Sequence, residues 1–293
     1  MNIMKWLIFG GKGWIGSNVS DYLLQQNEVV IHAESRADEE TAVENELLKI
    51  KPDRVISLIG RTYGPGFNSI DYLEQKGKLV ENMKDNLYGP LVLALLCKKY
   101  NIHLTYLGTG CIFNGTKGDS GNGYTENAKP DFFGSSYSTV KGFTDRLMHF
   151  FDTDVLNVRI RMPITADNSP RNFITKILTY KKICSIPNSM SVLPELLPIM
   201  IDMAKNKMTG TINLVNPGLI THNEILEMVK EIINPNLQWD NFSVEEMNKI
   251  ILSDRSNNLL DTSKLEKLYP TVLPIKESVI NIIHKMKKLN VDN

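Results

Sequence analysis

The sequence predicts an α/β protein built on a doubly wound parallel sheet. Short, β-branched apolar runs alternate with longer segments of helical periodicity in the first half of the chain, which is the pattern of βαβ units. A glycine-rich turn directly follows the first apolar run. Hydrophobic residues make up 42% and charged residues 23% of the 293 residues, as in ordinary globular proteins, which excludes a disordered or fibrous chain.

The first part of the chain supplies five strands and four helices. Each predicted strand is a short apolar run bounded by Gly, Pro, Asn or Asp, as expected of strands buried on both faces. The predicted strands are residues 6–9, 29–31, 54–59, 104–107 and 155–160. Apolar residues at helical spacing fill the gaps between them. The predicted helices are residues 14–26, 39–50, 71–99 and 137–150.

After residue 163 the alternation loosens, which predicts a smaller α/β lobe in the second part of the chain. We place the boundary between a large domain, residues 1–163, and this lobe, residues 164–293, while allowing segments to interleave. The elements predicted in the lobe are helices 171–182, 194–206, 222–233 and 243–251 and a strand at 211–215.

Charge and cysteine content narrow the function classes. With 33 Lys and Arg against 33 Asp and Glu the net charge is zero, which argues against a general nucleic-acid binder. No apolar run approaches the roughly 18 residues of a membrane span, and the N-terminus leads into a strand without a signal-peptide pattern, so we expect a cytoplasmic protein that does not enter a membrane. The three cysteines are widely spaced, which favours neither a disulfide framework nor a metal site.

A glycine turn follows the first strand and opens onto a helix. Gly10, Gly13 and Gly16 stand at the spacing G-x-x-G-x-x-G. Glycines permit a tight turn and let backbone amides, including those of Trp14 and Ile15, reach a pyrophosphate at the helix N-terminus. A glycine cluster alone could be only a turn. Because the strand, the helix and the next βαβ unit all stand where the motif requires, we predict a Rossmann-type dinucleotide site.

The residues after the second strand bear on which dinucleotide binds. An acidic group there favours a free ribose 2′-hydroxyl, whereas an arginine accommodates a 2′-phosphate. Glu34 indicates the first, while Ser35 and Arg36 together indicate the second. We therefore predict NADPH, with NADH as the alternative.

Three residues have the chemistry of a carbonyl reductase. Tyr137 and Lys141 lie four residues apart on one predicted helix and therefore on one face of it. The lysine can bind the ribose and favour ionisation of the phenol, which makes Tyr137 a usable proton donor to a carbonyl that receives hydride. Thr109, near the end of the fourth strand, would hydrogen-bond the same oxygen.

Asn86 lies in the predicted helix 71–99, before the fourth strand. It could organise a backbone kink or a water near Lys141, next to the cofactor. An ordinary polar residue on a helix surface explains it equally well on sequence grounds.

These residues resemble the extended short-chain dehydrogenase/reductase superfamily, whose members act mostly on nucleotide sugars. Further stretches, spread over nearly the whole chain, resemble the plant-type bifunctional UDP-4-keto-6-deoxy-D-glucose 3,5-epimerase/4-reductase family, which makes UDP-L-rhamnose. These stretches are residues 108–113, 159–164, 170–176, 186–190, 216–218, 222–228 and 255–258. The resemblance implies an NADPH-dependent oxidoreductase that is also an isomerase, with a smaller lobe that binds the nucleotide sugar.

The resemblance also implies two epimerase residues. Cys111 stands two positions after Thr109, where relatives that only reduce typically have tyrosine, and the segment 172–176 ends in Lys176. In the bifunctional family this cysteine and this lysine are implicated in epimerisation. Which of them removes the proton stays open, and Cys111 could instead be a small buried hydrophobe.

For the nucleotide sugar, Arg255 is the first candidate, because a guanidinium offers bidentate geometry to a phosphate and the family has a late arginine motif. We predict that the amide of Asn172 contacts sugar or phosphate, whereas Arg171 holds the lobe together.

The sequence thus predicts a bifunctional epimerase and reductase that forms UDP-L-rhamnose. A reductase alone, acting on a dTDP or UDP sugar, is the first alternative, and a non-catalytic dinucleotide-binding protein is the second. The choice between uridine and thymidine sugars stays open. A homodimer through the helices 71–99 and 137–150 is a further expectation.

Overall fold

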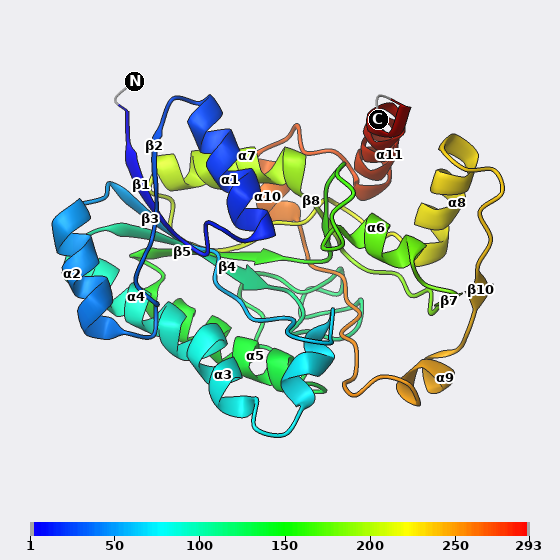
Figure 1. Ribbon diagram of the computed structural model, residues 1–293, viewed down its shortest axis with the longest axis horizontal. Helices are drawn as coiled ribbons and strands as arrows, with labels where there is room; N and C mark the ends of the chain where they lie inside the picture. The colour runs from blue at the N-terminus through cyan, green and yellow to red at the C-terminus, as the bar shows by residue number, and fades with distance from the viewer. Residues whose placement is uncertain (1–2, 292–293) are drawn as a thin grey trace. The chain divides into compact units, whose positions relative to one another are not determined.

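The computed structural model describes residues 3–291 and forms two compact units that are interleaved in sequence (Figure 1). The first unit consists of the chain up to residue 112 together with residues 129–159 and 198–212. The second consists of residues 113–128, 160–197 and the chain from residue 213 onward. The two units thus interleave around the boundary placed near residue 163, with residues 113–128 and 160–163 in the second unit and residues 198–212 in the first.

A six-stranded sheet forms the centre of the first unit, in the order β2-β1-β3-β4-β5-β9. The strands are β1 (Lys5–Phe9), β2 (Val29–His32), β3 (Arg54–Ser57), β4 (His103–Thr109), β5 (Val155–Ile160) and β9 (Gly210–Asn213). β1 pairs in parallel with both β2 and β3, and β3 pairs in parallel with β4. Since the chain runs outward from β1 to β2 and then crosses back to β3, the predicted doubly wound sheet is confirmed.

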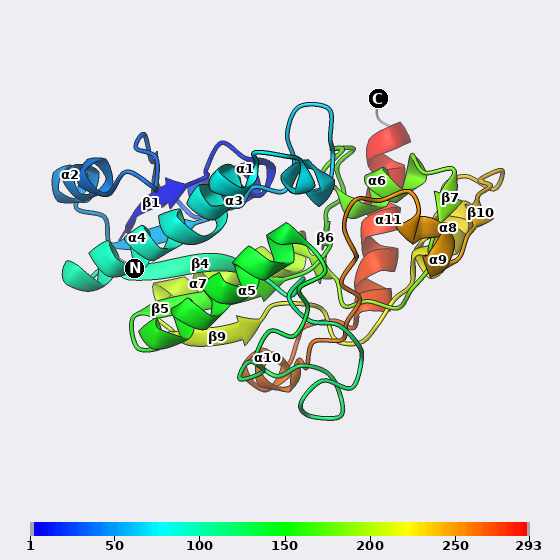
Figure 2. The ribbon, with the colours of Figure 1, turned by 90° about the horizontal axis from the view of Figure 1, so that it is seen from below.

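Helices cover both faces of this sheet, which explains why β3, β4 and β5 are buried throughout, whereas the edge strand β2 is partly exposed (Figures 1 and 2). The helices are α1 (Trp14–Gln25), α2 (Glu40–Ile50), α4 (Gly89–Lys99), α5 (Ser136–Met148) and α7 (Leu193–Lys205). α2, α4 and α5 pack side by side on one face, and α1 lies on the other. A single turn, η3 (His149–Phe151), continues α5.

The helix predicted over residues 71–99 is broken into four parts. They are η1 (Ile70–Glu74), α3 (Leu79–Met83), the π-helical turn η2 (Lys84–Tyr88) and α4. The break after η1 contains Gly77 in the left-handed region, at φ +85°. The helical spacing of apolar residues continues across this break, which is why the sequence predicts one helix there.

Two strands also differ from the prediction. β3 ends at Ser57, two residues earlier than predicted. β9 was expected in the smaller lobe, but it is the edge strand of the large sheet, next to β5. The apolar residues of β9 predict a strand. They do not predict which sheet the strand joins, because its pairing partners are set by tertiary packing.

The second unit packs helices around two small parallel sheets. These sheets pair β6 (Pro163–Ile164) with β8 (Ser191–Val192), and β7 (Lys182–Ile183) with β10 (Asp240–Asn241). The helices are α6 (Phe173–Leu178), α8 (His222–Ile232), α9 (Val244–Asn248), α10 (Ser263–Leu268) and α11 (Ile275–Val291). The sequence analysis did not predict the last two.

One apolar core holds the second unit together. It includes Ile164, Ile174, Val192, Ile225 and Ile283, which come from α6, α8, α11 and the β6–β8 sheet. Within the part of the chain that the structure describes, no helix is both long and apolar enough to cross a membrane.

Candidate active site

The glycine turn between β1 and α1 has the geometry of an anion-binding loop. Gly10 has φ +80°, a conformation that side chains rarely adopt. A Cβ on Gly16 would come within 2.2 Å of the Gly10 carbonyl oxygen, so only glycine fits there. Gly13 is the N-cap of α1 and offers no side chain to the first amides of the helix, which include those of Trp14 and Ile15. The turn therefore fits the pyrophosphate of a dinucleotide.

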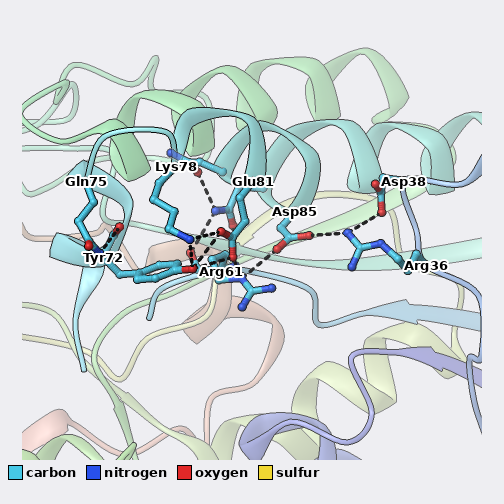
Figure 3. A network of polar contacts seen from close by, with 10 residues as sticks. Arg36, Asp38, Arg61, Tyr72, Gln75, Lys78, Glu81 and Asp85 are labelled. Atoms are coloured by element: carbon cyan, nitrogen blue, oxygen red, sulfur yellow. Dashed lines mark hydrogen bonds and ion pairs between the residues drawn. The ribbon is translucent and has the colours of Figure 1, made fainter. Parts of the chain in front are cut away.

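The loop after β2 holds the two residues predicted to select NADPH. The hydroxyl of Ser35 donates to the carboxylate of Glu46, which also accepts from the Ser35 backbone amide at 3.0 Å. Arg36 is about half exposed and forms ion pairs with Asp38 at 2.9 Å and with Asp85 at 3.3 Å (Figure 3). The guanidinium itself is accessible to a phosphate, although both of its carboxylate partners are largely buried.

Asn86 binds the backbone of the segment after β3 through its side chain. It is fully buried in the π-helical turn η2. Its side-chain oxygen accepts from the backbone N–H of Arg61 at 3.0 Å, and its amide group donates to the Arg61 carbonyl at 3.0 Å and to Asn82 at 2.8 Å. Asn86 thus fixes the segment that follows β3. The alternative of an exposed helix residue is wrong.

The first turn of α5, which carries Tyr137, is held from two directions. Ser135 caps the helix by accepting from the Ser138 backbone amide at 2.9 Å. Ser136 accepts a hydrogen bond from Asn82 at 2.8 Å, and its backbone amide donates to Glu74 at 2.6 Å. Asn82 therefore links the π turn to the helix of Tyr137. The sequence analysis did not single out this residue, whose only signal is its position four residues before Asn86.

Thr109, Cys111 and Tyr137 lie together at the end of β4. The backbone amide of Cys111 donates to Thr109 Oγ1 at 3.0 Å. Cys111 is half-buried and packs against a cluster formed by Tyr72, Leu73 and Tyr137. The structure thus brings the predicted proton donor, its hydroxyl partner and the predicted epimerase thiol into one neighbourhood of the first unit.

Lys141 lies one turn after Tyr137 on α5 and is buried. Its ammonium donates a hydrogen bond to the hydroxyl of Tyr106 on β4. Burial lowers the pKa of Lys141 to about 7, while the negative charges of Asp145 and of an ionised Cys111 act in the opposite direction. Burial also raises the pKa of Tyr106, so this partner remains a neutral phenol.

A network of alternating charges borders the segment 61–78 (Figure 3). Arg61 donates to Asp85 at 2.9 Å and approaches Glu81 at 3.3 Å. The Tyr72 hydroxyl lies between the Lys78 ammonium, at 2.6 Å, and the carboxylate of Glu81, at 3.0 Å. Because the ring of Tyr72 packs next to Tyr137, this network fixes one wall of the site.

Asn172 belongs to the second unit, and its predicted contact with substrate is not supported. It is fully buried and is the N-cap of α6, where its oxygen accepts from the backbone amides of Thr165 and Ile174. Its amide group donates to the carbonyl oxygens of Thr165 and Asp167 at 3.0 and 2.8 Å. Since every hydrogen-bonding position of this side chain is used, Asn172 shapes the start of α6, which carries Lys176.

Lys176 and Arg255 are both half-buried in the second unit. Lys176 follows the N-cap of α6 by four residues. Arg255 donates to Ser253 at 2.5 Å and precedes Ser256, which accepts from the buried guanidinium of Arg161 at 2.9 Å. No cluster of His, Cys, Asp and Glu that could hold a metal ion exists among the described residues.

A Rossmann-type sheet with a glycine turn, a Thr–Tyr–Lys set and a second unit with its own core defines the class of the protein. It is an extended short-chain dehydrogenase/reductase. Residues 4–180 match the family described as the RmlD substrate binding domain, so the chain belongs to this family.

Similar proteins agree with this assignment. The L780 protein of Acanthamoeba polyphaga mimivirus is 65% identical over 286 residues, which cover 97% of this chain and 99% of that protein. The crystal structure of the L780 UDP-rhamnose synthase from the same virus has a TM-score of 0.96 at 64% identity and covers 97% of this chain and 100% of that one.

Two plant proteins are similar along the same length. A trifunctional UDP-glucose 4,6-dehydratase/UDP-4-keto-6-deoxy-D-glucose 3,5-epimerase/UDP-4-keto-L-rhamnose-reductase of Arabidopsis thaliana is 42% identical over 97% of this chain, which corresponds to 42% of the plant protein. A bifunctional dTDP-4-dehydrorhamnose 3,5-epimerase/dTDP-4-dehydrorhamnose reductase of the same plant is 39% identical over 97% of this chain and 94% of its own length.

Proposed function

We propose that this protein converts UDP-4-keto-6-deoxy-D-glucose to UDP-L-rhamnose, as a 3,5-epimerase and an NADPH-dependent 4-keto reductase. The observation that carries this proposal is the hydrogen bond from the Cys111 backbone amide to Thr109 Oγ1. It fixes the residue whose thiol is assigned to epimerisation next to the hydroxyl assigned to reduction. Similarity to the L780 synthase and to both plant enzymes supports the same reaction.

The two reactions can share one oxygen-binding site. In a 4-keto sugar, C3 and C5 both lie next to the carbonyl carbon, so removal of a proton from either gives an enolate with its charge on O4. We assign Thr109 and Tyr137 as the hydrogen-bond donors to that oxygen. The same donors then serve reduction, in which Tyr137 gives its proton to O4 as the carbonyl becomes a hydroxyl.

Thr109 is prepared for the role of donor. Its Oγ1 already accepts from the backbone amide of Cys111, so its hydroxyl hydrogen points toward another acceptor. We assign Lys141, one turn along α5 from Tyr137, as the cation that favours ionisation of the phenol after proton transfer.

Inversion of a carbon needs a base on one face of the ring and an acid on the other. We assign Cys111 and Lys176 to these two roles. A thiol near a cation ionises close to neutral pH, which suits proton removal. We infer that both inversions precede reduction, because the reduced sugar no longer has a carbonyl to acidify C3 and C5.

We assign the cofactor site to the glycine turn from Gly10 to Gly16, with Ser35 and Arg36 meeting the 2′-phosphate. The close backbone approach at Gly16 supports the assignment of the pyrophosphate to this turn. The exposed guanidinium of Arg36 supports the assignment of the 2′-phosphate. NADPH supplies the hydride that reduces C4. Lys141 binds the ribose, and Arg255 binds the diphosphate of the sugar nucleotide.

Product analysis with three substrates tests the proposal. Purified protein is incubated with NADPH and UDP-4-keto-6-deoxy-D-glucose, its dTDP counterpart or the already epimerised UDP-4-keto-L-rhamnose. We expect a reduced rhamnose from the first and the third. A reductase without epimerase activity would consume NADPH only with the epimerised sugar, and a non-catalytic protein would consume none.

We also propose that the protein is a homodimer. Large apolar side chains are exposed on α3 and α5, among them Leu79, Val80, Met83 and Phe143. Light scattering on the purified protein is expected to give twice the mass of the 33.2 kDa chain. The three cysteines are unpaired, which supports a cytoplasmic location.

A further inference from the structure

The environment of Lys141 contains a residue that neither the sequence analysis nor the proposed reaction uses. Tyr106 lies on β4, three residues before Thr109, and is almost fully buried. Its hydroxyl accepts a hydrogen bond from the Lys141 ammonium. The same ammonium lies 4.6 Å from the centroid of the Tyr106 ring, within the range of a cation–π interaction.

Lys141 needs such a partner because its surroundings oppose its charge. Burial lowers its pKa to about 7 in these surroundings, so the side chain is close to losing its proton at neutral pH. Asp145 on α5 and an ionised Cys111 raise that pKa through their charges, and Tyr137 is the other titratable group near this pair. Asp145 itself is held by Arg159 at 2.8 Å, so its support of Lys141 is partly cancelled.

A glycine at position 108 lets β4 pack closely against β5 beside Tyr106. Position 108, two residues further along β4, is glycine, and a Cβ there would come within 2.7 Å of the Asn157 side-chain oxygen and 3.6 Å of the Tyr106 ring. The missing side chain therefore leaves room for the Asn157 side chain on the neighbouring strand β5, while the Tyr106 ring would be at ordinary contact distance. Burial raises the pKa of Tyr106, so its phenol stays neutral and remains an acceptor.

We propose that Tyr106 is a positioning residue that holds Lys141 in its charged form and directs its ammonium within the site. The effect on reduction rests on the proposed function, whereas the effect on the charge of Lys141 does not. One N–H of the ammonium is fixed by the phenol, which leaves the other two for the ribose and for the neighbourhood of Tyr137. Without this hydroxyl, Lys141 would lose its proton at a lower pH. Reduction would then also be lost at a lower pH than in the native chain.

The variants Tyr106→Phe and Tyr106→His test this inference. Phenylalanine keeps the ring and removes the acceptor, whereas histidine restores an acceptor nitrogen on an aromatic ring. Tyr100→Phe is the matched control, since that hydroxyl donates to Glu44 at 2.5 Å, away from α5. The titration of Lys141 is followed by NMR of the side-chain ¹³Cε in cofactor-free protein, with the signal assigned by Lys141→Met.

We expect the Lys141 midpoint to fall by about one pH unit in Tyr106→Phe, as loss of a hydrogen bond to a charged group predicts. It should recover in Tyr106→His and stay unchanged in Tyr100→Phe. The fall of kcat/KM for reduction at high pH should move by the same amount, so that activity drops about tenfold at pH 8 but only about twofold at pH 6. A Tyr106→Phe protein that titrates like the native chain overturns the inference.

A second measurement needs no destabilising variant. In the native sequence with 3-fluorotyrosine at position 106, the ¹⁹F signal should follow the Lys141 titration, and a signal that does not change between pH 5.5 and 9 overturns the inference. Both NMR titrations are independent of turnover. A protein without reductase activity would therefore contradict the proposed function while leaving the pairing of Tyr106 with Lys141 to be decided by the titrations.

Discussion

The backbone amide of Cys111 donates to the hydroxyl oxygen of Thr109 at 3.0 Å, so one turn after β4 carries a group for each of the two proposed reactions. The relationship is local, because two residues of sequence separate the partners. It leaves the threonine hydroxyl hydrogen for another acceptor, and Cys111 packs against the cluster that contains Tyr137. Substitutions at these two positions should therefore affect the two reactions differently.

Thr109→Val should impair both reactions, because it keeps the shape of the side chain and removes the hydroxyl donor. Loss of one preorganised donor to an oxyanion typically costs about 10²-fold to 10³-fold in kcat. Thr105→Val is the matched control on the same strand, since the buried Thr105 hydroxyl has no hydrogen-bond partner. Steady-state kinetics should show a large loss only at position 109. Equal kinetics for both variants would remove Thr109 from the mechanism.

Cys111→Ala should separate the two activities. We expect hydrogen exchange at C3 and C5 to fall about 10²-fold or more, as for loss of a general acid or base, while reduction of an already epimerised sugar is largely kept. Cys97→Ala is the control, because burial raises the pKa of Cys97 to about 12 and keeps this thiol neutral. Full exchange in Cys111→Ala would show that the thiol is only a packing residue.

Arg36→Ala should change the choice of cofactor. If this guanidinium binds the 2′-phosphate, the Kd for NADPH should rise about 10-fold to 100-fold, as for loss of a charge-assisted hydrogen bond, with little change for NADH. Lys84→Ala is a suitable control, since Lys84 also pairs with Asp38, at 3.4 Å, and is exposed. Equal weakening of both cofactors by Arg36→Ala would argue against a contact with the 2′-phosphate.

His222 should make the protein sensitive to acid. Burial lowers its pKa from 6.5 to about 4, and its Nδ1 has no hydrogen-bond partner. Between these two pH values His222 is protonated in the unfolded chain and neutral in the folded chain. The free energy of unfolding is therefore highest above pH 6.5 and decreases as the pH falls toward 4. The loss is at most about 3 kcal/mol, and smaller where water reaches the ring.

Urea unfolding of His222→Leu measures this effect. The slope of the unfolding free energy between pH 6.5 and 5 should be shallower than in the native chain, whereas His284→Gln, at an exposed position, should keep the native slope. Identical slopes in all three proteins would contradict a His222 that resists protonation in the folded chain.

The sequence is informative wherever function depends on local patterns. The glycine turn, the strand end at Thr109 and the pair Tyr137 and Lys141 each occupy a few consecutive residues, and the structure has all of them on the expected elements. The same holds for the order of strands and helices up to β5. Periodicity and turn residues act over short distances, which is why they can be interpreted from one chain.

Features that depend on distant partners could not be predicted. The π turn exists because Asn86 bonds the backbone of Arg61, 25 residues away, and Tyr106 has meaning only through Lys141, 35 residues away. The amide of Asn172 was expected to contact sugar or phosphate, yet its hydrogen bonds go to the N-terminus of α6 and to the backbone of Thr165 and Asp167. Likewise, no local signal tells that β9 joins the large sheet.

Mass spectrometry in deuterated water tests the bifunctional assignment most directly. Purified protein is incubated with UDP-4-keto-6-deoxy-D-glucose, first without NADPH and then with it. We predict deuterium at two ring carbons, C3 and C5, before any NADPH is added, followed by conversion to a labelled UDP-L-rhamnose when it is. Label that enters only together with hydride transfer would contradict the proposed order, and neither label nor consumption of NADPH would contradict the assignment itself.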